Sequence, residues 1–243
     1  MKHLDSIKLE KGWKAWFGEF SPGLAYHSPK GRETFGFDLP MDTRELMHRH
    51  GKCPDPRVGD NSKQSDWVAY KEWWFVTEFE AGIPAAGERL FLKTRGVDHL
   101  AEYFLNGRHF GSGESFNRTL FFDITDFLRT GHQELAVRLW TTDPAGICSP
   151  DQVAGPAGPQ AADIANLHLS SKGQIKATAQ SLKARMLFGG DHNPMMLSCG
   201  MAMAPELIRC RGALVRSMRL DYEMNADGTR ASGQFVFDGT AWE

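Results

Sequence analysis

The sequence predicts an all-β protein, a β-sandwich or jelly roll, on three observations. Period-two alternation of apolar and polar residues recurs from Trp67 onward and is typical of half-buried strands. Turn residues separate these segments at short intervals, and long helical periodicity is almost absent. The 243 residues include 7 Trp and 16 Phe, and such large flat side chains fill the space between two packed sheets.

Two segments show the alternation most clearly. The segment KEWWFVTEF (71–79) places four side chains on one face, Trp73, Phe75, Thr77 and Phe79, and three on the other, Trp74, Val76 and Glu78. The segment HQELAVRLW (132–140) buries Leu135, Val137 and Leu139, with Ala136 and Arg138 opposite. Each is expected to be a strand with one face in the core.

Two more strands are expected in ERLFLKTRG (88–96) and HLAEYFLNG (99–107). The second ends in Asn106-Gly107, a strong hairpin motif because both residues tolerate a positive φ. We expect consecutive strands in this region to be antiparallel. In FFDITDFLRTGHQEL (121–135) one short helical turn is expected, capped by Asp123 or Thr125 and ended by Gly131.

Other segments depart from the strand pattern. MDTRELMHRHG (41–51) predicts a short helix with Asp42 as N-cap, Glu45 three residues later and Gly51 as its end. The stretch from Thr141, with four prolines and three glycines, predicts a long surface loop. After Gly212, two strands joined by a turn at 225–228 are expected. Two strands cannot bury a core alone, so they belong to the sandwich or begin a second domain.

Composition excludes several classes of function. With 28 basic and 30 acidic residues, a net charge of −2 and no basic cluster, we expect no nucleic-acid binding. No apolar run approaches the roughly 18 to 20 residues that span a bilayer, so no membrane association is expected. The N-terminal residues lack the apolar stretch of a secretory signal, which leaves the compartment open. The four cysteines are Cys53, Cys148, Cys199 and Cys210. They lie far apart and include no Cys-x-x-Cys pair, so neither a structural zinc site nor a disulfide framework is expected.

The segment LKARMLFGGDHNPMMLSCG (182–200) sets Asp191 beside His192 in apolar surroundings. A catalytic dyad would need a nucleophile or an activated water, and no motif supplies that third member. A metal site would need distant ligands, for which Asp60, His99 and His109 are available but not suitably spaced. Two further interpretations stay open, a turn capped by Asp191 and a loop that contributes to a carbohydrate site.

Several motifs together resemble the N-terminal sugar-binding domain of glycoside hydrolase family 2. They occur in the order typical of that domain, as Gly96 and Asp98, Leu105 to Gly107, Gly111, Phe122 to Thr125, and Gly131, Leu135 and Val137. Upstream, a Pro-Asp-Pro and a Gly-Asp-Asn precede the tryptophan-rich strand, as in the β-mannosidase branch of the family. The resemblance extends over about residues 13–237. It implies a galactose-binding-like jelly roll over residues 1–211 and the first strands of an immunoglobulin-like domain over residues 212–243.

The resemblance also gives the segment around Asp191 an expected role. β-Mannosidases typically carry Phe-Gly-Trp-Asp-Trp-Gly-Pro here, and the aspartate bonds the sugar in the neighbouring catalytic barrel. This chain reads Phe-Gly-Gly-Asp-His-Asn-Pro over residues 188–194, so both tryptophans are replaced. A carboxylate beside an imidazole can still bind vicinal hydroxyls through charge-assisted hydrogen bonds. The expected substrate-binding residues are therefore Asp191, His192 and Asn193.

Catalysis is not expected from this chain by itself. In the family, the two catalytic glutamates lie on a (β/α)₈ barrel of about 250 residues, one of them in an Asn-Glu dipeptide. This chain contains no Asn-Glu dipeptide, and we expect no catalytic residue, metal or cofactor. The resemblance implies a non-catalytic carbohydrate-binding domain of a β-mannosidase-like, retaining exo-glycosidase. The alternative is a free-standing lectin-like module, and the end after FDGTAWE favours the fragment.

The expected partners follow from the same resemblance. They are a β-glycoside and the catalytic barrel of the same parent chain. The exposed strands after Gly212 also predict a homodimer through the hairpin between Val215 and Phe237, because unpaired edges and apolar patches promote association.

Overall fold

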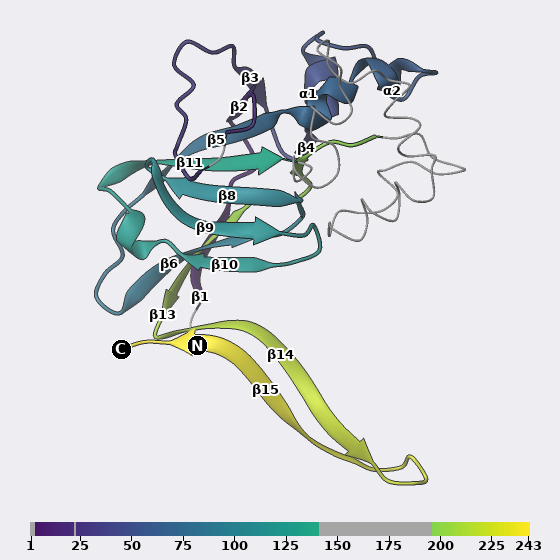
Figure 1. Cartoon of the computed structure of the whole chain (residues 1–243). Coiled ribbons are helices and arrows are strands. Elements are labelled where there is room, and N and C mark those ends of the chain that lie inside the picture. The colour runs from purple at the N-terminus through teal and green to yellow at the C-terminus, as the bar shows by residue number, and fades with distance from the viewer. Residues whose placement is uncertain (1–2, 22, 141–195) are drawn as a thin grey trace.

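Two antiparallel sheets form the body of the protein in the computed structural model, which describes residues 3–21, 23–140 and 196–243 (Figure 1). The four-stranded sheet has the order β1 (His3–Lys8), β13 (Glu206–Arg211), β6 (Glu88–Thr94) and β10 (Leu120–Asp123). The six-stranded sheet has the order β3 (Phe35–Phe37), β2 (Trp13–Gly18), β5 (Glu72–Ala81), β11 (Gly131–Trp140), β8 (Leu100–Leu105) and β9 (Arg108–Glu114). The predicted all-β sandwich is confirmed.

The main core lies between these two sheets. Leu92 of β6 and Leu207 of β13 share one apolar cluster with Phe75, Tyr103 and Val137 of the six-stranded sheet. All five side chains are at most 4% exposed. Burying a side chain of this size stabilises the fold by about 1.5–3 kcal/mol, so this layer holds the two sheets together.

Part of the outer face of the six-stranded sheet is also buried, which the alternation alone does not predict. Trp74 and Val76 point away from the main core as expected, yet they are only 1% and 8% exposed. They pack with Trp16, Phe104 and Ala136 in a second cluster, against which Tyr26 is packed. The segment between β2 and β3 contributes Tyr26, so β5 is buried on both faces at its start.

A buried ion pair ties that covering segment to the sheet. Arg138 of β11 bonds Glu72 of β5 at 2.7 Å, and both side chains are at most 3% exposed. The same guanidinium donates to the carbonyl oxygens of Ser21 and Gly23, and the backbone N–H of Ser21 donates to Glu72 at 3.0 Å. Arg138 therefore lies opposite the main core as predicted, but in a second buried layer.

The strands pair in the antiparallel sense that the sequence predicts, but their order in the sheets does not follow their order in the chain. β5 and β6 are consecutive in the chain but lie in different sheets, and β11 pairs with both β5 and β8. β8 and β9 form the predicted hairpin, with φ of 53° at Asn106 and 78° at Gly107. Consecutive strands such as β5 and β6 are therefore not always neighbours, because a sandwich exchanges strands between its two layers.

The predicted short helical elements are present, with one boundary shifted. The turn after β10 is the 3₁₀ helix η2 (Thr125–Phe127), whose first backbone N–H donates to Asp123 at 3.1 Å. It ends at Phe127, so Gly131 begins β11 and does not end the turn. Helix α1 (Thr43–Arg49) has Asp42 as its N-cap, as predicted, and two further short helices are α2 (Asn61–Gln64) and η1 (Asp66–Tyr70).

A small third sheet joins three distant parts of the chain at one end of the sandwich. Its order is β4 (Met41–Asp42), β12 (Gly200–Met201) and β7 (Val97–Asp98). β12 follows directly on the segment that contains the predicted binding residues. The small sheet therefore connects that segment to helix α1, which continues from β4 (Figure 1).

Among the strands that the structure describes, the last two, β14 (Ala213–Met224) and β15 (Ala231–Ala241), pair only with each other and extend away from the sandwich (Figure 1). The predicted turn between them is present. At the base, the indole of Trp242 donates to the carbonyl oxygen of Gly87 at 3.0 Å and packs on Phe91. None of the helices in the described part of the chain is long and apolar enough to cross a membrane.

Candidate functional site

The three predicted substrate-binding residues, Asp191, His192 and Asn193, lie outside the described residues, as does the predicted loop from Thr141. The structure does describe the chain immediately after them, from Met196 onward. Leu197 and Cys199 are 2% and 0% exposed and are held against α1. The candidate site is therefore built from the framework to which its segment is attached.

Arg44 of helix α1 is the central residue of this framework. Its side chain is 1% exposed, and its Nε donates to the carbonyl oxygen of Leu197 at 2.7 Å. The two other guanidinium nitrogens bond Ser62 and Ser65 near α2 and the Asp66 carboxylate at 2.9 Å. Burial raises the pKa of the Asp66 carboxyl, and the Arg44 charge opposes that shift. One side chain thus joins α1, α2 and the segment that follows the predicted site.

Hydrogen bonds that involve the backbone also hold the segment from Leu197 to Gly200 in place. The backbone N–H of Thr43 donates to the carbonyl oxygen of Cys199 at 2.9 Å, and the N–H of Cys199 donates to the Thr43 hydroxyl at 3.2 Å. Gly200 pairs with Asp42 on one side and Asp98 on the other. A Cβ on Gly200 would lie 2.4 Å from the carbonyl oxygen of Met41, so only glycine fits this close approach.

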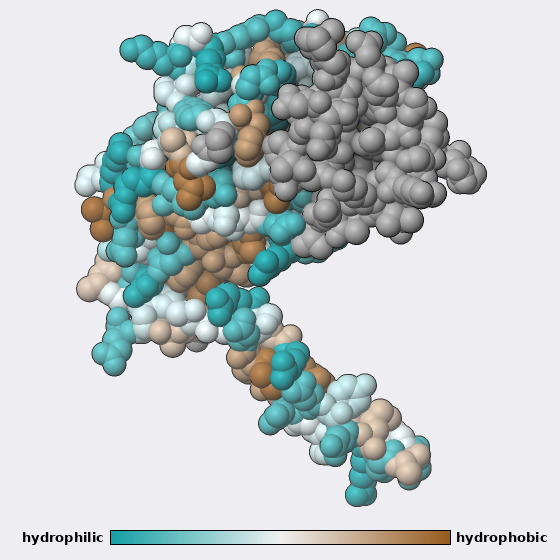
Figure 2. Space-filling view, viewed as in Figure 1, coloured by the Kyte–Doolittle hydropathy of each residue, from teal (hydrophilic) through white to brown (hydrophobic). Residues whose placement is uncertain are grey.

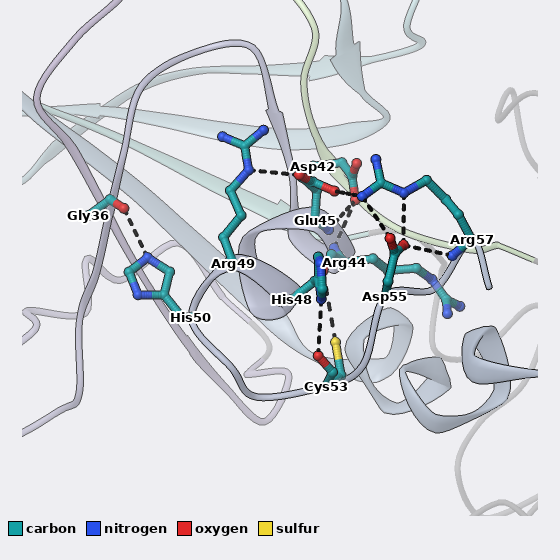
Figure 3. Close-up of polar contacts among 10 residues, drawn as sticks. All are labelled: Gly36, Asp42, Arg44, Glu45, His48, Arg49, His50, Cys53, Asp55 and Arg57. Carbon is teal, nitrogen blue, oxygen red and sulfur yellow. Dashed lines mark hydrogen bonds and ion pairs between the residues drawn. The ribbon is translucent and has the colours of Figure 1, made fainter.

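Charged side chains surround the first turns of α1 (Figure 3). The Asp42 carboxylate accepts from the backbone N–H groups of Arg44 and Glu45 at 2.8 and 3.1 Å, which caps the helix. Burial raises the pKa of the Asp42 carboxyl despite these two bonds. Glu45 forms ion pairs with Arg49 at 2.7 Å and with Arg57 at 3.4 Å. In a capping box, the Glu45 carboxylate would instead accept from the backbone N–H of Asp42.

A cleft of about 300 Å³ opens beside this framework. Phe116, which is 38% exposed, lines it together with Asp42, Glu45 and Asp98. An aromatic face and carboxylate oxygens are the groups that stack on a sugar ring and accept hydrogen bonds from its hydroxyls. The cleft therefore has the size and the lining to hold part of a carbohydrate next to β12.

The residues considered for a metal site are not brought together. His109 pairs with Glu102 at 2.5 Å, Asp60 is exposed and pairs with Lys63, and His99 is 2% exposed. Within the ranges that the structure describes, no group of three or more His, Cys, Asp or Glu is arranged to hold a metal ion.

Sequence reasoning missed two buried arginines, Arg44 and Arg138. Arg44 precedes Met47 by three residues and therefore shares its buried helix face, which is a recognisable pattern. Arg138 was assigned to the correct face of its strand, but the cover over that face comes from a distant segment. Local alternation contains no information about such a cover.

The sequence profile of the family described as "Glycosyl hydrolase 2 galactose-binding domain-like" matches residues 26–202. This range contains five of the six strands of the six-stranded sheet, two of the four strands of the other sheet, the small sheet and the framework around Arg44. The chain belongs to this family. The predicted resemblance and the galactose-binding-like class of the sandwich are thereby confirmed.

The curated relatives that the chain resembles are β-mannosidases. It is 26% identical over 167 residues to β-mannosidase B of Thermothelomyces thermophilus, covering 67% of this chain and 18% of that protein. It is 30% identical over 69 residues to β-mannosidase B of Aspergillus clavatus, covering 28% of this chain and 8% of that protein. The chain thus spans less than a fifth of the length of these relatives, and the β-mannosidase-like branch predicted from the motifs is supported.

Solved structures share the fold. The β-D-mannosidase of Dictyoglomus thermophilum superposes with a TM-score of 0.73 at 18% identity, over 98% of this chain and 26% of that one. The exo-chitosanase of Amycolatopsis orientalis superposes with a TM-score of 0.61 at 14% identity, over 98% of this chain and 24% of that one. At these identities the likeness concerns the fold alone.

Proposed function

We propose that this chain is the non-catalytic, N-terminal carbohydrate-binding domain of a family 2 glycoside hydrolase, a β-mannosidase-like retaining exo-glycosidase. The observation that carries the proposal is the family match over residues 26–202. The partial coverage of longer β-mannosidases supports placing the catalytic barrel, with its two carboxylic acids, elsewhere in a longer parent chain. The domain's ligand is a β-glycoside held between the sandwich and that barrel.

The proposed division of the chain places the sandwich in residues 1–211 and the start of an immunoglobulin-like domain in residues 212–243. The separate pairing of β14 with β15 supports this boundary, because the two strands extend neither of the large sheets. A homodimer of this chain is a further proposal, and none of the similarities to known proteins bears on it.

The proposed sugar contacts are Asp191, His192 and Asn193. Their segment leads into Leu197 and Gly200, which are held by Arg44 and by β4 and β7. Such anchoring supports a binding role, since recognition residues must be positioned by a rigid scaffold. The cleft beside Phe116 is the described surface that could accept part of the same sugar.

The test uses the full reading frame that contains this chain. Replacing Asp191→Ala is expected to lower kcat/KM on an aryl β-mannoside by roughly 10- to 100-fold, because the variant loses one charge-assisted hydrogen bond to the substrate. The matched control is Asp60→Ala, since Asp60 is exposed and is not placed in the proposed site. Unchanged turnover in the Asp191 variant would mean that this residue only shapes a turn.

Titration of the isolated chain with mannose and mannobiose separates this proposal from a free-standing lectin-like module. A domain that completes a site with a barrel is expected to bind free sugar only weakly, with a Kd above about 1 mM. Tighter binding that is lost in the Asp191→Ala variant would favour the lectin-like module.

A further inference from the structure

Two clefts adjoin one another beside the small sheet. The smaller one, of about 300 Å³, is the cleft lined by Phe116, and the larger has a volume of about 480 Å³. Pro40 and Ala202 line both clefts. The larger cleft also contains Glu206, the first residue of β13, whereas the hairpin follows the last residue of that strand, Arg211. The two clefts, which we call the paired groove, therefore lie at the opposite end of β13 from the hairpin.

Each cleft combines one exposed apolar residue with polar groups. Phe116 in the smaller cleft is 38% exposed, and Met203 in the larger cleft is 50% exposed. The charged residues that line the larger cleft are Lys8, Lys93, Arg95, Glu10 and Glu206. These charges nearly balance, and Lys93 pairs with Glu206 at 3.1 Å. Mixed donors and acceptors beside an apolar surface suit a neutral ring with many hydroxyl groups better than a highly charged ligand.

The backbone holds Phe116 in a fixed position. The backbone N–H of Gly96 donates to the carbonyl oxygen of Phe116 at 3.1 Å, and the N–H of Ala202 donates to that of Gly96 at 2.8 Å. The preceding residue, Ser115, has a φ of 85°, and its N–H donates to the carbonyl oxygen of His99 at 3.0 Å. Such a φ is strained for a residue other than glycine and persists only where the surroundings enforce it. Phe116 is therefore linked through Gly96 to the wall that both clefts share.

We propose that the paired groove binds the sugar units on the leaving-group side of the bond to be cleaved, so that the parent enzyme favours oligosaccharides over glycosides with a small aglycone. This inference rests on the proposed function, whose ligand is a β-glycoside. Each cleft is within the roughly 300–1,000 Å³ range of small-ligand sites.

The order of residues along the chain assigns one sugar unit to each cleft. Gly200 and Met201, which follow the proposed sugar contacts, line the smaller cleft, and Met203 lines the larger one. The second sugar from the non-reducing end therefore stacks on Phe116, and the third lies beside Met203. The proposal thus predicts that the effect of a substitution depends on the length of the substrate.

The test compares kcat/KM of the full reading frame on methyl β-mannoside, mannobiose and mannotriose. Phe116→Ala should lower the ratio of kcat/KM for mannobiose to that for methyl β-mannoside by roughly 5- to 10-fold, as expected for the loss of one aromatic contact. The change should appear in KM, because a remote sugar is bound equally in the ground state and the transition state. Arg95→Ala should lower the ratio for mannotriose to mannobiose by a similar factor, because only the third sugar reaches the larger cleft.

The matched control is Phe235→Ala, which should change neither ratio. Phe235 is 61% exposed on the projecting hairpin, where Figure 2 shows apolar residues at the surface. Asp191→Ala should lower kcat/KM on all three substrates and leave both ratios unchanged, so failure of the proposed sugar contact is distinguishable from failure of the groove. Ratios that Phe116→Ala leaves unchanged, or losses that appear in kcat alone, would overturn the proposal.

Direct binding tests the groove even if the parent enzyme hydrolyses no mannoside. Nuclear magnetic resonance of the 243-residue chain with mannotriose should show shifts at the backbone amides of Gly96 and Ala202, and Phe116→Ala should reduce them. Shifts without turnover by the parent would reject the proposed mannosidase activity and retain the groove. Unchanged amide signals at roughly 50 mM mannotriose, far above a Kd in the millimolar range, would reject the groove itself.

Discussion

The Asn106-Gly107 turn connects a dipeptide in the sequence to a fixed backbone geometry. Both residues have a positive φ, and Asn106 also donates from its side chain to Gln133 at 2.8 Å and to the carbonyl oxygen of Phe127 at 3.0 Å. The turn is therefore joined to β11 and η2, not only to its own strands. This explains why asparagine, which tolerates the conformation and bonds its surroundings, precedes the glycine.

Replacing Gly107→Val is expected to lower the free energy of unfolding by about 1–2 kcal/mol or more, because a β-branched side chain is strained at a φ of 78°. Urea unfolding followed by tryptophan emission measures the change. The matched control is Gly36→Val in β3, where φ is not left-handed and a Cβ would meet no atom within 4 Å. Equal midpoints for both variants would show that the turn does not require its left-handed conformation.

Glu206 illustrates how one carboxylate makes stability depend on pH. Its oxygens accept from the Ser6 hydroxyl at 2.6 Å and the Lys93 ammonium at 3.1 Å, and these contacts lower the pKa of Glu206. A lowered folded-state pKa gives stability that is present above the unfolded value of about 4.3. That stability is lost as the pH falls through the folded-state pKa.

The variant Glu206→Gln is therefore expected to be less stable than the native chain at pH 7, by no more than about 1 kcal/mol because the pair is partly exposed. The difference should shrink as the pH falls below about 4. Urea unfolding between neutral and acidic pH measures it. Glu33→Gln serves as the control, since Glu33 is 63% exposed in its pair with Lys52. A difference that is the same at all pH values would contradict the assignment.

At the scale of elements, α1 depends on tertiary contacts more than on its own length. A helix of seven residues is too short to be stable alone, and Arg44 compensates by joining it to α2 and to the chain at Leu197. The outer aromatic layer is stabilised in a similar way, because the ion pair of Arg138 and Glu72 attaches a distant segment over Trp16 and Trp74. In both places, a buried ion pair with several hydrogen bonds connects segments that are not joined by regular secondary structure.

Replacing Arg44→Met should lower the free energy of unfolding by about 3–5 kcal/mol, because the buried Asp66 carboxylate and the Leu197 carbonyl oxygen would lose their partner. The control is Arg49→Met on the same helix, where the Arg49 side chain is 60% exposed, and its effect should stay within about 0.5 kcal/mol. Chemical denaturation of both variants measures the contrast. Similar losses in the two variants would contradict a structural role specific to Arg44.

At the scale of the whole molecule, the sandwich and the hairpin present different surfaces. The sandwich buries aromatic side chains between its sheets and on an outer face, whereas the hairpin exposes Phe235 and Phe237 at 61% and 60%. Family membership accounts for the sandwich. The exposed hairpin is the part of the molecule where a further contact, within or between chains, would remove apolar side chains from water.

The isolated chain is expected to hydrolyse no aryl β-mannoside, β-galactoside or β-glucuronide. Retaining hydrolysis needs two carboxylic acids about 5 to 5.5 Å apart across the glycosidic bond, and the proposal places both on a separate barrel. Release of the chromophore measures turnover, and an Asp191→Ala preparation made in parallel controls for contaminating glycosidases. Turnover that follows the purified chain and falls in that variant would contradict the non-catalytic role.

The sequence alone determined the local features of this protein and its family. Alternation predicted β5 and β11, Asn106-Gly107 predicted a hairpin and Asp42 predicted a helix cap, because each depends on contacts between residues close in the chain. The ordered motifs identified the family for the same reason.

Only the tertiary structure decided which strands are neighbours and which polar groups are buried. β6 joins β13 and β10, and β11 separates β5 from β8, because pairing in a sandwich depends on the packing of two layers. Arg44 and Arg138 can be buried with their charges because their carboxylate and carbonyl partners come from distant segments. Such partners are specified by the folded core, which brings residues more than sixty positions apart into hydrogen-bond distance.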